Sequence, residues 1–222
     1  MLVSGSFDAS VRIWDVKSQQ MKPIMVLEEA KDSVSCVLAG GAAGIAGEYE
    51  ILAGSVDGRV RCYDLRKGVL DTDVIGSSVT SLQRTRDGNG VLVGTLDSTI
   101  RLMDRDGGGL LRSYRDDGWK NNEFRLRSAF GGNERWVLCG NEDVTGDDGE
   151  VVVWDTLTGK VVERVRVPGG SNAGEKQRIG TDGKVKEKRN PISCIAWKQN
   201  GRGDQWCCGG IDGIVTVFGP PS

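Results

Sequence analysis

Two stretches of the sequence hold residue types that could do chemistry. The stretch GGSNAGEK (169–176) approaches a phosphate-binding loop, but Glu175 precedes Lys176, no Ser or Thr follows, and no helix is predicted there. The run NEDVTGDDGE (141–150) offers oxygen ligands that suit calcium, although their spacing is not that of an EF-hand loop. Its carboxylates are Glu142, Asp143, Asp147, Asp148 and Glu150. We therefore predict a flexible insertion and a long turn, with no cofactor and no metal.

Histidine is absent from all 222 residues. This removes the commonest general base and metal ligand from any mechanism. The sequence also contains no nucleophile elbow, so we predict no catalytic residue, no small-molecule substrate and no enzyme activity. The cysteines form no CxxC pair and are predicted to be reduced core residues of a cytosolic or nuclear protein.

The charges are balanced. The chain has 29 basic and 31 acidic residues, so no overall field attracts it to nucleic acid or to an anionic membrane. No apolar run approaches the ~18 residues of a membrane span. One basic loop, 175–189, holds Lys176, Arg178, Lys184, Lys186, Lys188 and Arg189 without aromatic residues. It is a weak signal for nucleic-acid binding or nuclear import, and the alternative is a solvated, disordered loop. We predict neither direct nucleic-acid nor membrane binding.

One pattern recurs five times: LVSGSFDASVRIWD (2–15), ILAGSVDGRVRCYD (51–64), VLVGTLDSTIRLMD (91–104), VLCGNEDVTGDDGEVVVWD (137–155) and WCCGGIDGIVTVFG (206–219). An apolar run ends in Gly, an Asp follows at the turn, and β-branched residues lead to an aromatic or large apolar residue and a closing Asp. Each copy is predicted to be a β-hairpin. The positions that we assign a structural role are Asp8, Trp14, Asp15, Asp57, Asp64, Asp97, Asp104, Trp154, Asp155 and Asp212.

Two further strand-like runs separate successive hairpins, and no stretch shows helical periodicity. A four-stranded unit of about 40 residues that ends in Trp-Asp predicts an all-β WD40 β-propeller, in which neighbouring blades cover each other's sheets. We expect one partial propeller of about four and a half blades. The blades are predicted at 1–29 (lacking the innermost strand a), 33–75, 78–115, 124–167 and 192–219 (lacking the outermost strand d), with 168–190 as an insertion.

The segments LEEAKDSVS (27–35), EILAGSVDGRVRCYDLRKGVL (50–70), LDSTIRLMDRDGGGLLRSY (96–114) and NNEFRLRS (121–128) resemble the mitogen-activated protein kinase organiser family of WD40 proteins. The resemblance is densest over residues 1–155. It implies that the chain is the C-terminal arc of a seven-bladed ring and looks truncated at its N-terminus. The 168–190 loop and Gly219, where the closing Asp would be usual, depart from the family pattern.

The resemblance also implies a function. Members of the family are scaffolds for MAP kinase cascade components and are associated with the spliceosome, in the cytoplasm and the nucleus. The expected partners are therefore other proteins. An adaptor of another complex is an alternative, and a propeller enzyme acting at its channel is a second one.

Many WD repeats use a Gly-His pair to buttress the turn Asp and the Trp. Because this chain has no His, we expect its blades to depend more on apolar packing. Arg12, Arg61 and Arg101 recur at one place in three copies, which we interpret as packing between sheets rather than partner recognition.

The b–c turns and the d–a loops of a propeller lie on one face, which makes them a natural docking surface. Four apolar residues directly precede the turn Asp, and Trp119 lies in the polar loop DDGWKNNE (116–123), with local packing as the alternative role. The predicted protein-binding residues are Phe7, Glu28, Glu29, Lys31, Val56, Leu96, Trp119 and Ile211.

Overall fold

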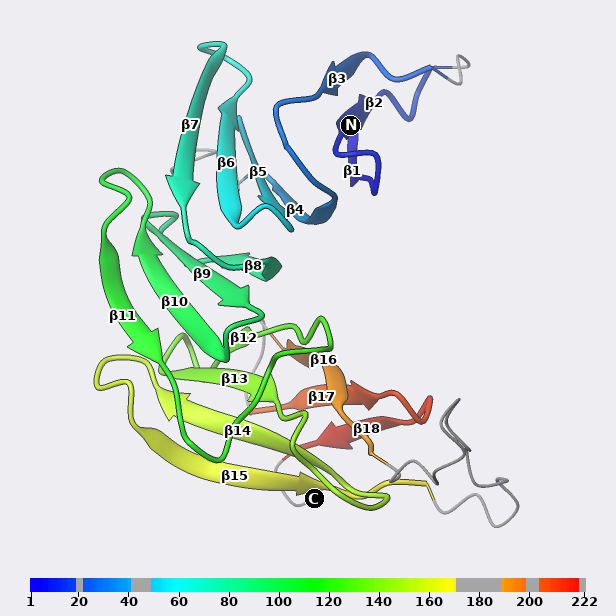
Figure 1. Cartoon of the computed structure of the whole chain (residues 1–222), viewed down its shortest axis with the longest axis vertical. Helices are drawn as coiled ribbons and strands as arrows, with labels where there is room; N and C mark the ends of the chain where they lie inside the picture. Colours follow the sequence, from blue (N-terminus) through cyan, green and yellow to red (C-terminus); the bar gives the residue numbers. More distant parts are fainter. Residues whose placement is uncertain (19–21, 41–48, 171–188, 199–203, 220–222) are drawn as a thin grey trace. The chain divides into compact units, whose positions relative to one another are not determined.

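The computed structural model describes residues 1–18, 22–40, 49–170, 189–198 and 204–219 (Figure 1). These residues form five antiparallel sheets of three or four strands, which confirms the predicted all-β fold of WD40 blades. Across the described ranges, no helix is long and apolar enough to span a membrane. The chain divides into two compact units, Met1–Ser113 and Tyr114–Ser222.

The first unit contains three sheets, each formed by strands that follow one another in the chain. Sheet 1 consists of β1 (Leu2–Gly5), β2 (Val11–Trp14) and β3 (Met25–Leu27). Sheet 2 consists of β4 (Val34–Ala39), β5 (Glu50–Ser55), β6 (Arg59–Asp64) and β7 (Val69–Val74). Sheet 3 consists of β8 (Val79–Arg84), β9 (Gly90–Thr95), β10 (Thr99–Asp104) and β11 (Leu110–Tyr114).

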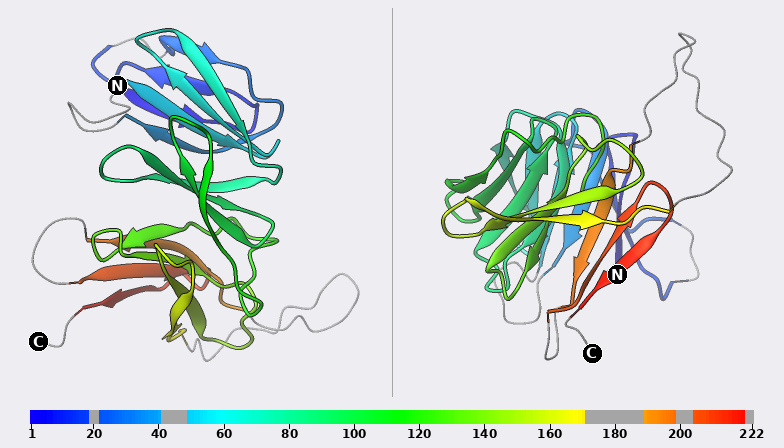
Figure 2. Two further views of the ribbon diagram at one scale, coloured as in Figure 1. Left: turned by 90° about the vertical axis from the view of Figure 1, so that its left-hand side faces the viewer. Right: turned by 90° about the horizontal axis from the view of Figure 1, so that it is seen from below.

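The second unit contains two sheets, and Figure 2 shows all five from two further sides. Sheet 4 consists of β12 (Ala129–Gly131), β13 (Trp136–Gly140), β14 (Gly149–Asp155) and β15 (Val161–Val167). Sheet 5 consists of β16 (Ile192–Trp197), β17 (Trp206–Gly210) and β18 (Val215–Phe218).

One predicted strand is shorter than expected. The run 124–130 was predicted to be a strand, but β12 begins only at Ala129. The reason is that two backbone N–H groups of this run donate to acceptors that do not belong to a neighbouring strand. The N–H of Phe124 donates to the Glu142 carboxylate at 2.6 Å, and that of Leu126 donates to the Phe124 carbonyl at 3.0 Å. These bonds hold the residues before Ala129 in an irregular loop.

In the first unit, the hydrophobic core lies between the sheets. Val11 and Ile13 of sheet 1 pack in one cluster with residues of sheet 2 that include Tyr63. A second cluster joins Leu52 and Val60 of sheet 2 to residues of sheet 3. Adjacent β5 residues serve different clusters because side chains alternate across a strand. Sheet 2 is therefore covered on both faces, as each internal unit of a stacked repeat must be.

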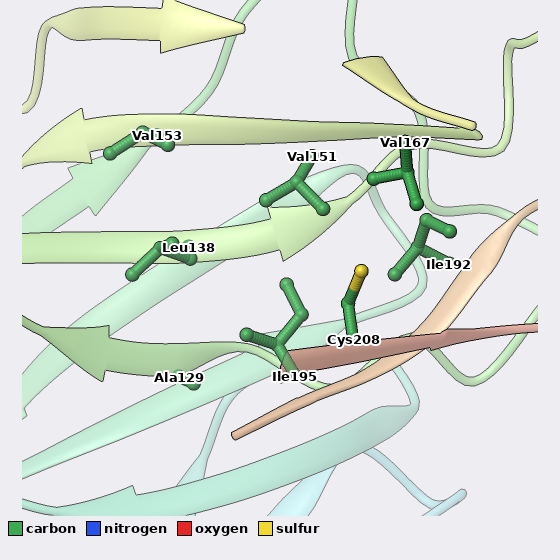
Figure 3. Packing of buried hydrophobic residues seen from close by; sticks show 8 residues of the cluster. All are labelled: Ala129, Leu138, Val151, Val153, Val167, Ile192, Ile195 and Cys208. Carbon is green, nitrogen blue, oxygen red and sulfur yellow. The ribbon is translucent and has the colours of Figure 1, made fainter. Parts of the chain in front are cut away.

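The core of the second unit lies between sheets 4 and 5. Figure 3 shows Ile195 and Cys208 of sheet 5 facing Leu138 and Val151 of sheet 4. Gly140 permits this close approach, because a Cβ atom there would lie 2.0 Å from the carbonyl oxygen of Ile192. A side chain at position 140 would therefore force the two sheets apart.

All six cysteines are free thiols. Cys139 and Cys208 are buried, and burial raises the pKa of the Cys208 thiol to about 11. Cys194 is exposed, so its prediction as a core residue is wrong.

Candidate protein-binding rim

The hairpin turns of sheets 1, 2 and 3 are each locked by an aspartate. In sheet 2, Asp57 accepts the backbone N–H of Arg59 at 3.1 Å, and its other oxygen accepts Arg61 Nη2 at 2.7 Å. The hydroxyl of Ser55 donates to the same carboxylate. Burial would raise the pKa of Asp57, but the bonds from Arg61 and Ser55 outweigh it and lower that pKa below its ordinary value.

The other two turns repeat this arrangement. Arg12 pairs with Asp8 at 2.5 Å, and Arg101 pairs with Asp97 at 2.6 Å. Hydrogen bonds from Ser10 and then Arg12 lower the pKa of Asp8. At Asp97 burial acts in the opposite direction, but bonds from Arg101 and Thr95 lower its pKa as well.

These contacts correct one interpretation. Arg12, Arg61 and Arg101 were predicted to pack between sheets, but each forms an ion pair with the turn aspartate four residues earlier. At each of these turns a guanidinium and a hydroxyl donate hydrogen bonds to the carboxylate, and the guanidinium also supplies a counter-charge. The greater dependence of the blades on apolar packing in the absence of histidine stays a prediction.

A row of hydrogen bonds connects the three turns. Ser33, in the loop before β4, donates its hydroxyl to the Phe7 carbonyl at 3.3 Å, and its own carbonyl accepts the N–H of Val56 at 2.9 Å. Ser78, in the loop before β8, repeats both bonds: its hydroxyl donates to the Val56 carbonyl at 3.0 Å, and its carbonyl accepts the N–H of Leu96 at 3.0 Å. We call Phe7, Ser33, Val56, Ser78 and Leu96 the turn rim.

The turn rim presents three of the predicted binding residues together. Phe7 is 78% exposed, whereas Val56 and Leu96 are half-buried. An exposed phenylalanine held on a hydrogen-bonded backbone is a suitable anchor for a protein partner, because it loses little conformational entropy on binding.

The predicted charged residues lie beside the rim, in the loop between β3 and β4. Glu28, Glu29 and Lys31 are all exposed. The backbone N–H of Lys31 donates to Asp57 Oδ2 at 3.0 Å, which attaches this loop to the sheet 2 turn. Burial, followed by the nearby Glu29 carboxylate, raises the pKa of Tyr63.

The other two predicted binding residues belong to the second unit. Ile211 is 49% exposed, and its N–H donates to the Pro191 carbonyl at 3.2 Å. Trp119 is only 1% exposed, so its prediction as a surface contact is wrong. Its indole N–H donates to the Gly140 carbonyl at 2.7 Å, and its ring packs edge-on against Trp154 with centroids 5.1 Å apart.

Sequence reasoning missed the two serines and the role of Glu142. The two serines could have been found from their position in the repeat, because each directly precedes the first residue of an inner strand, β4 or β8. Pro191 has the corresponding position before β16. Glu142 occupies the place of Phe7, Val56, Leu96 and Ile211 in its copy. It is buried, and its carboxylate accepts backbone N–H groups of Asn122, Glu123 and Phe124.

The other carboxylates of the acidic run have separate partners. Asp143 pairs with Lys120 at 2.6 Å, Asp148 accepts the N–H of Gly169 at 3.0 Å, and Glu150 pairs with Arg164 at 2.9 Å. Within the described ranges, no group of three or more His, Cys, Asp or Glu side chains is placed to hold a metal. Residues 171–188, which include most of the phosphate-loop-like stretch and of the basic loop, lie outside the described residues.

Comparison with known proteins agrees with this architecture. The family model described as WD domain, G-beta repeat matches residues 1–15, which are β1, the Asp8 turn, β2 and the closing Asp15. This match and the five antiparallel sheets agree with the fold of WD40 blades.

The similarity extends to particular relatives. The chain is similar to WD repeat domain-containing protein 83 of Rattus norvegicus, with 41% identity over 156 residues, which are 70% of this chain and 44% of that protein. The human protein of the same name is 42% identical over 153 residues, covering 69% of this chain and 44% of the relative. An uncharacterized WD repeat-containing protein of Schizosaccharomyces pombe is 43% identical over 139 residues, covering 63% and 42%. The chain thus spans less than half the length of these relatives.

Proposed function

We propose that this chain is a non-catalytic adaptor that binds other proteins through the turn rim and the adjoining loop with Glu28, Glu29 and Lys31. The observation that carries the proposal is the row of bonds through Ser33 and Ser78, which holds three apolar turn residues on one continuous backbone support. Rigid presentation of an exposed aromatic beside charged residues is typical of a protein-binding surface. Ile211 offers a further apolar contact on the second unit.

Two specific forms of this function are supported by the resemblance to the mitogen-activated protein kinase organiser family. In one, the chain gathers components of a MAP kinase cascade; in the other, it takes part in pre-mRNA splicing with spliceosomal proteins. The likeness to WD repeat domain-containing protein 83 supports the WD-repeat adaptor common to both. We propose that the protein acts in the cytoplasm and the nucleus, where such partners are found.

The two alternative functions, an adaptor of another complex and a propeller enzyme, require different features of the molecule. An adaptor of another complex would use the same rim with other partners, because fold does not determine the partner. A propeller enzyme would need a catalytic group, and a sequence without histidine leaves carboxylates, thiols, lysines and tyrosines as candidate general acids and bases. The aspartates of the turns of sheets 1–3 are already engaged by arginines.

The test is affinity purification of the tagged chain followed by mass spectrometry of the captured proteins. Phe7→Ala is compared with Leu157→Ala, since Leu157 is 79% exposed and belongs to the second unit, whereas the turn rim belongs to the first. Loss of captured proteins with Phe7→Ala alone supports the rim. The identity of those proteins, kinases or splicing factors, decides between the two specific forms. Equal capture by both variants contradicts the surface assignment.

A further inference from the structure

Four aromatic side chains line one end of the core of the second unit. Trp136 begins β13, Trp197 ends β16, Trp206 begins β17 and Phe218 ends β18. Because the strands are antiparallel, these positions lie at the end of sheets 4 and 5 that is opposite the β13–β14 and β17–β18 turns. All four side chains are half-buried and pack against the core between the two sheets. We call these four residues the aromatic row.

The rings of the aromatic row contact one another in series. The Trp206 ring stacks on that of Phe218, with centroids 4.2 Å apart and 9° between the ring planes. The Trp197 ring lies 6.2 Å from that of Trp206 and is parallel to it within 2°. Trp136 of sheet 4 completes the row, with its ring 5.8 Å from that of Trp197 and tilted by 58°. The row is therefore one continuous aromatic surface that crosses from sheet 4 to sheet 5.

Two adjacent glycines make room for these rings. A Cβ atom on Gly131 would lie 2.6 Å from Cε3 of Trp197, and one on Gly132 would lie 2.5 Å from Cε3 of Trp136. A side chain at either position would push a ring of the row out of place. The positions of Trp136 and Trp197 are therefore set by the backbone that they pack on.

The turn before β13 is strained. Gly132, Asn133 and Glu134 have φ angles of 54°, 55° and 68°, in the left-handed region that residues with a side chain rarely adopt. Such strain persists only where the surrounding structure holds it, and it is commonest at functional sites. The backbone N–H of Arg135 closes the turn by donating to the Gly132 carbonyl at 3.2 Å, and the Arg135 guanidinium lies 5.5 Å from the centroid of the Trp136 ring.

The tryptophans of the row have hydrogen-bond donors to offer. Within the described ranges, the indole N–H groups of Trp136, Trp197 and Trp206 donate to no acceptor, and unlike the Nε1 atom of Trp154 they are not buried. By contrast, the indole N–H of Trp14 is occupied by the Ser4 hydroxyl at 2.9 Å. An indole N–H can only donate. The row therefore combines apolar ring surface with donors that need an acceptor from outside.

Two classes of ligand fit this surface poorly. A nucleobase held between two parallel rings needs about 7 Å between them, twice a van der Waals contact distance. The parallel rings of the row are only 6.2 and 4.2 Å apart. A cationic ligand would lie on a ring face, but Arg135 already occupies that place at Trp136 and repels a second cation. The expected ligand is therefore apolar, not cationic, and rich in hydrogen-bond acceptors.

A proline-rich segment has these properties. In a polyproline II helix the pyrrolidine rings supply apolar surface and the backbone carbonyls are free to accept hydrogen bonds. Proline has no backbone N–H, so such a segment brings no donor that would require an acceptor on the row. Binding of polyproline II segments to aromatic surfaces is a recurring mode of peptide recognition, and it costs little conformational entropy because the helix is already extended.

We propose that the aromatic row binds a proline-rich segment of a partner protein in the polyproline II conformation. The proline rings pack on the exposed parts of the tryptophan rings, and the indole N–H groups donate to carbonyls of the segment. The row belongs to the second unit, whereas the turn rim belongs to the first. The site therefore goes beyond the proposed adaptor function and does not depend on the rim.

The experiment is fluorescence anisotropy of a fluorescein-labelled peptide of about ten prolines, which spans about 31 Å as a polyproline II helix. The whole chain is titrated to about 1 mM. Trp206→Phe retains a ring beside Phe218 but loses the indole donor. We expect it to bind the peptide about threefold to tenfold more weakly, because one neutral hydrogen bond is lost. Trp136→Phe makes the same change at the other end of the row and is expected to have a similar effect.

The controls separate the row from tryptophan substitution in general. Trp14→Phe makes the matched change in the first unit, at an indole that already has an acceptor, and should bind the peptide like the wild type. A labelled peptide of alternating glycine and serine has an N–H at every residue and no preformed helix, so it should not bind. Circular dichroism of each variant separates a lost site from a lost fold.

Three results would overturn the proposal. The first is a wild-type chain that does not bind the proline peptide. The second is a folded Trp206→Phe and a folded Trp136→Phe that both bind it as well as the wild type does, or no better than Trp14→Phe. The third is tighter binding of a labelled thymidine oligonucleotide of about ten nucleotides, because the row would then be a nucleic-acid site.

Discussion

The hydroxyl of Ser78 lies 3.0 Å from the carbonyl oxygen of Val56, and this bond ties the loop before sheet 3 to the turn of sheet 2. Ser33 makes the corresponding bond to Phe7 one repeat earlier. The two serines therefore hold neighbouring turns at a fixed spacing along the rim.

Removing this hydroxyl is expected to weaken the first unit modestly. We predict that Ser78→Ala lowers the free energy of unfolding by about 1 kcal/mol, because a neutral hydrogen bond is lost and the Val56 carbonyl is left without its donor. Urea denaturation followed by circular dichroism measures the change. Ser113→Ala, at an exposed position of β11, is the control and should leave stability unchanged. Equal stability of the two variants would show that the bond has no energetic role.

The ion pairs between the arginines and the turn aspartates are expected to differ in strength, because they differ in burial. In the Arg61–Asp57 pair the side chains are 4% and 8% exposed, whereas in the Arg12–Asp8 pair they are 33% and 48% exposed. We predict that Arg61→Ala costs about 3–5 kcal/mol, because it leaves a buried carboxylate without its counter-charge. Arg12→Ala should cost much less, because water solvates Asp8. Similar urea midpoints for the two variants would contradict this ranking.

The turn aspartates also predict a dependence on pH. The pKa values of Asp8, Asp57 and Asp97 are lowered in the folded state from the ordinary 3.8. Their contribution to stability is therefore complete only well above that value and is lost progressively as pH falls through the lowered pKa values. We expect the urea midpoint to decline below about pH 5. Asp97→Asn should be less stable at neutral pH and should show a shallower decline. An identical slope in the variant would exclude Asp97 as a contributor.

Trp119 is expected to stabilise the fold rather than to bind partners. Trp119→Ala should lower the free energy of unfolding by about 3–5 kcal/mol, because it removes a fully buried aromatic side chain. Trp119→Phe retains much of the packing against Trp154 but loses the donor to the Gly140 carbonyl, so a smaller loss is expected. Thermal unfolding measures both variants. Wild-type stability in Trp119→Ala would contradict this structural role.

The sequence predicted the repeated hairpins well because their signal is local. Each has a glycine at the end of an apolar strand, an aspartate at the turn and β-branched residues after it, and these features determine strand direction and alternation. The run 124–130 was predicted less well, because the competing acceptor, Glu142, lies 18 residues away from Phe124 in the chain. No local pattern indicates such a contact.

The candidate site was predictable only in part, for the same reason. Phe7, Val56 and Leu96 could be grouped by their place before the turn aspartate, but Glu142 has the same place and is buried. Trp119 lies in a polar segment, and only the fold shows that its ring packs against Trp154. The pairing of Arg61 with Asp57 was visible as a spacing of four residues, although its role became clear only from the turn geometry.

The bonds of the turn rim have a consequence for how binding specificity can change. The four bonds made by Ser33 and Ser78 each join a serine hydroxyl or a backbone N–H to a backbone carbonyl, and none of these four uses the side chain of Phe7, Val56 or Leu96. A substitution at one of these three positions therefore leaves intact the hydrogen bonds that position the backbone of the rim. A new partner can be accommodated by exchanging one of them, and the spacing of the remaining contacts is retained.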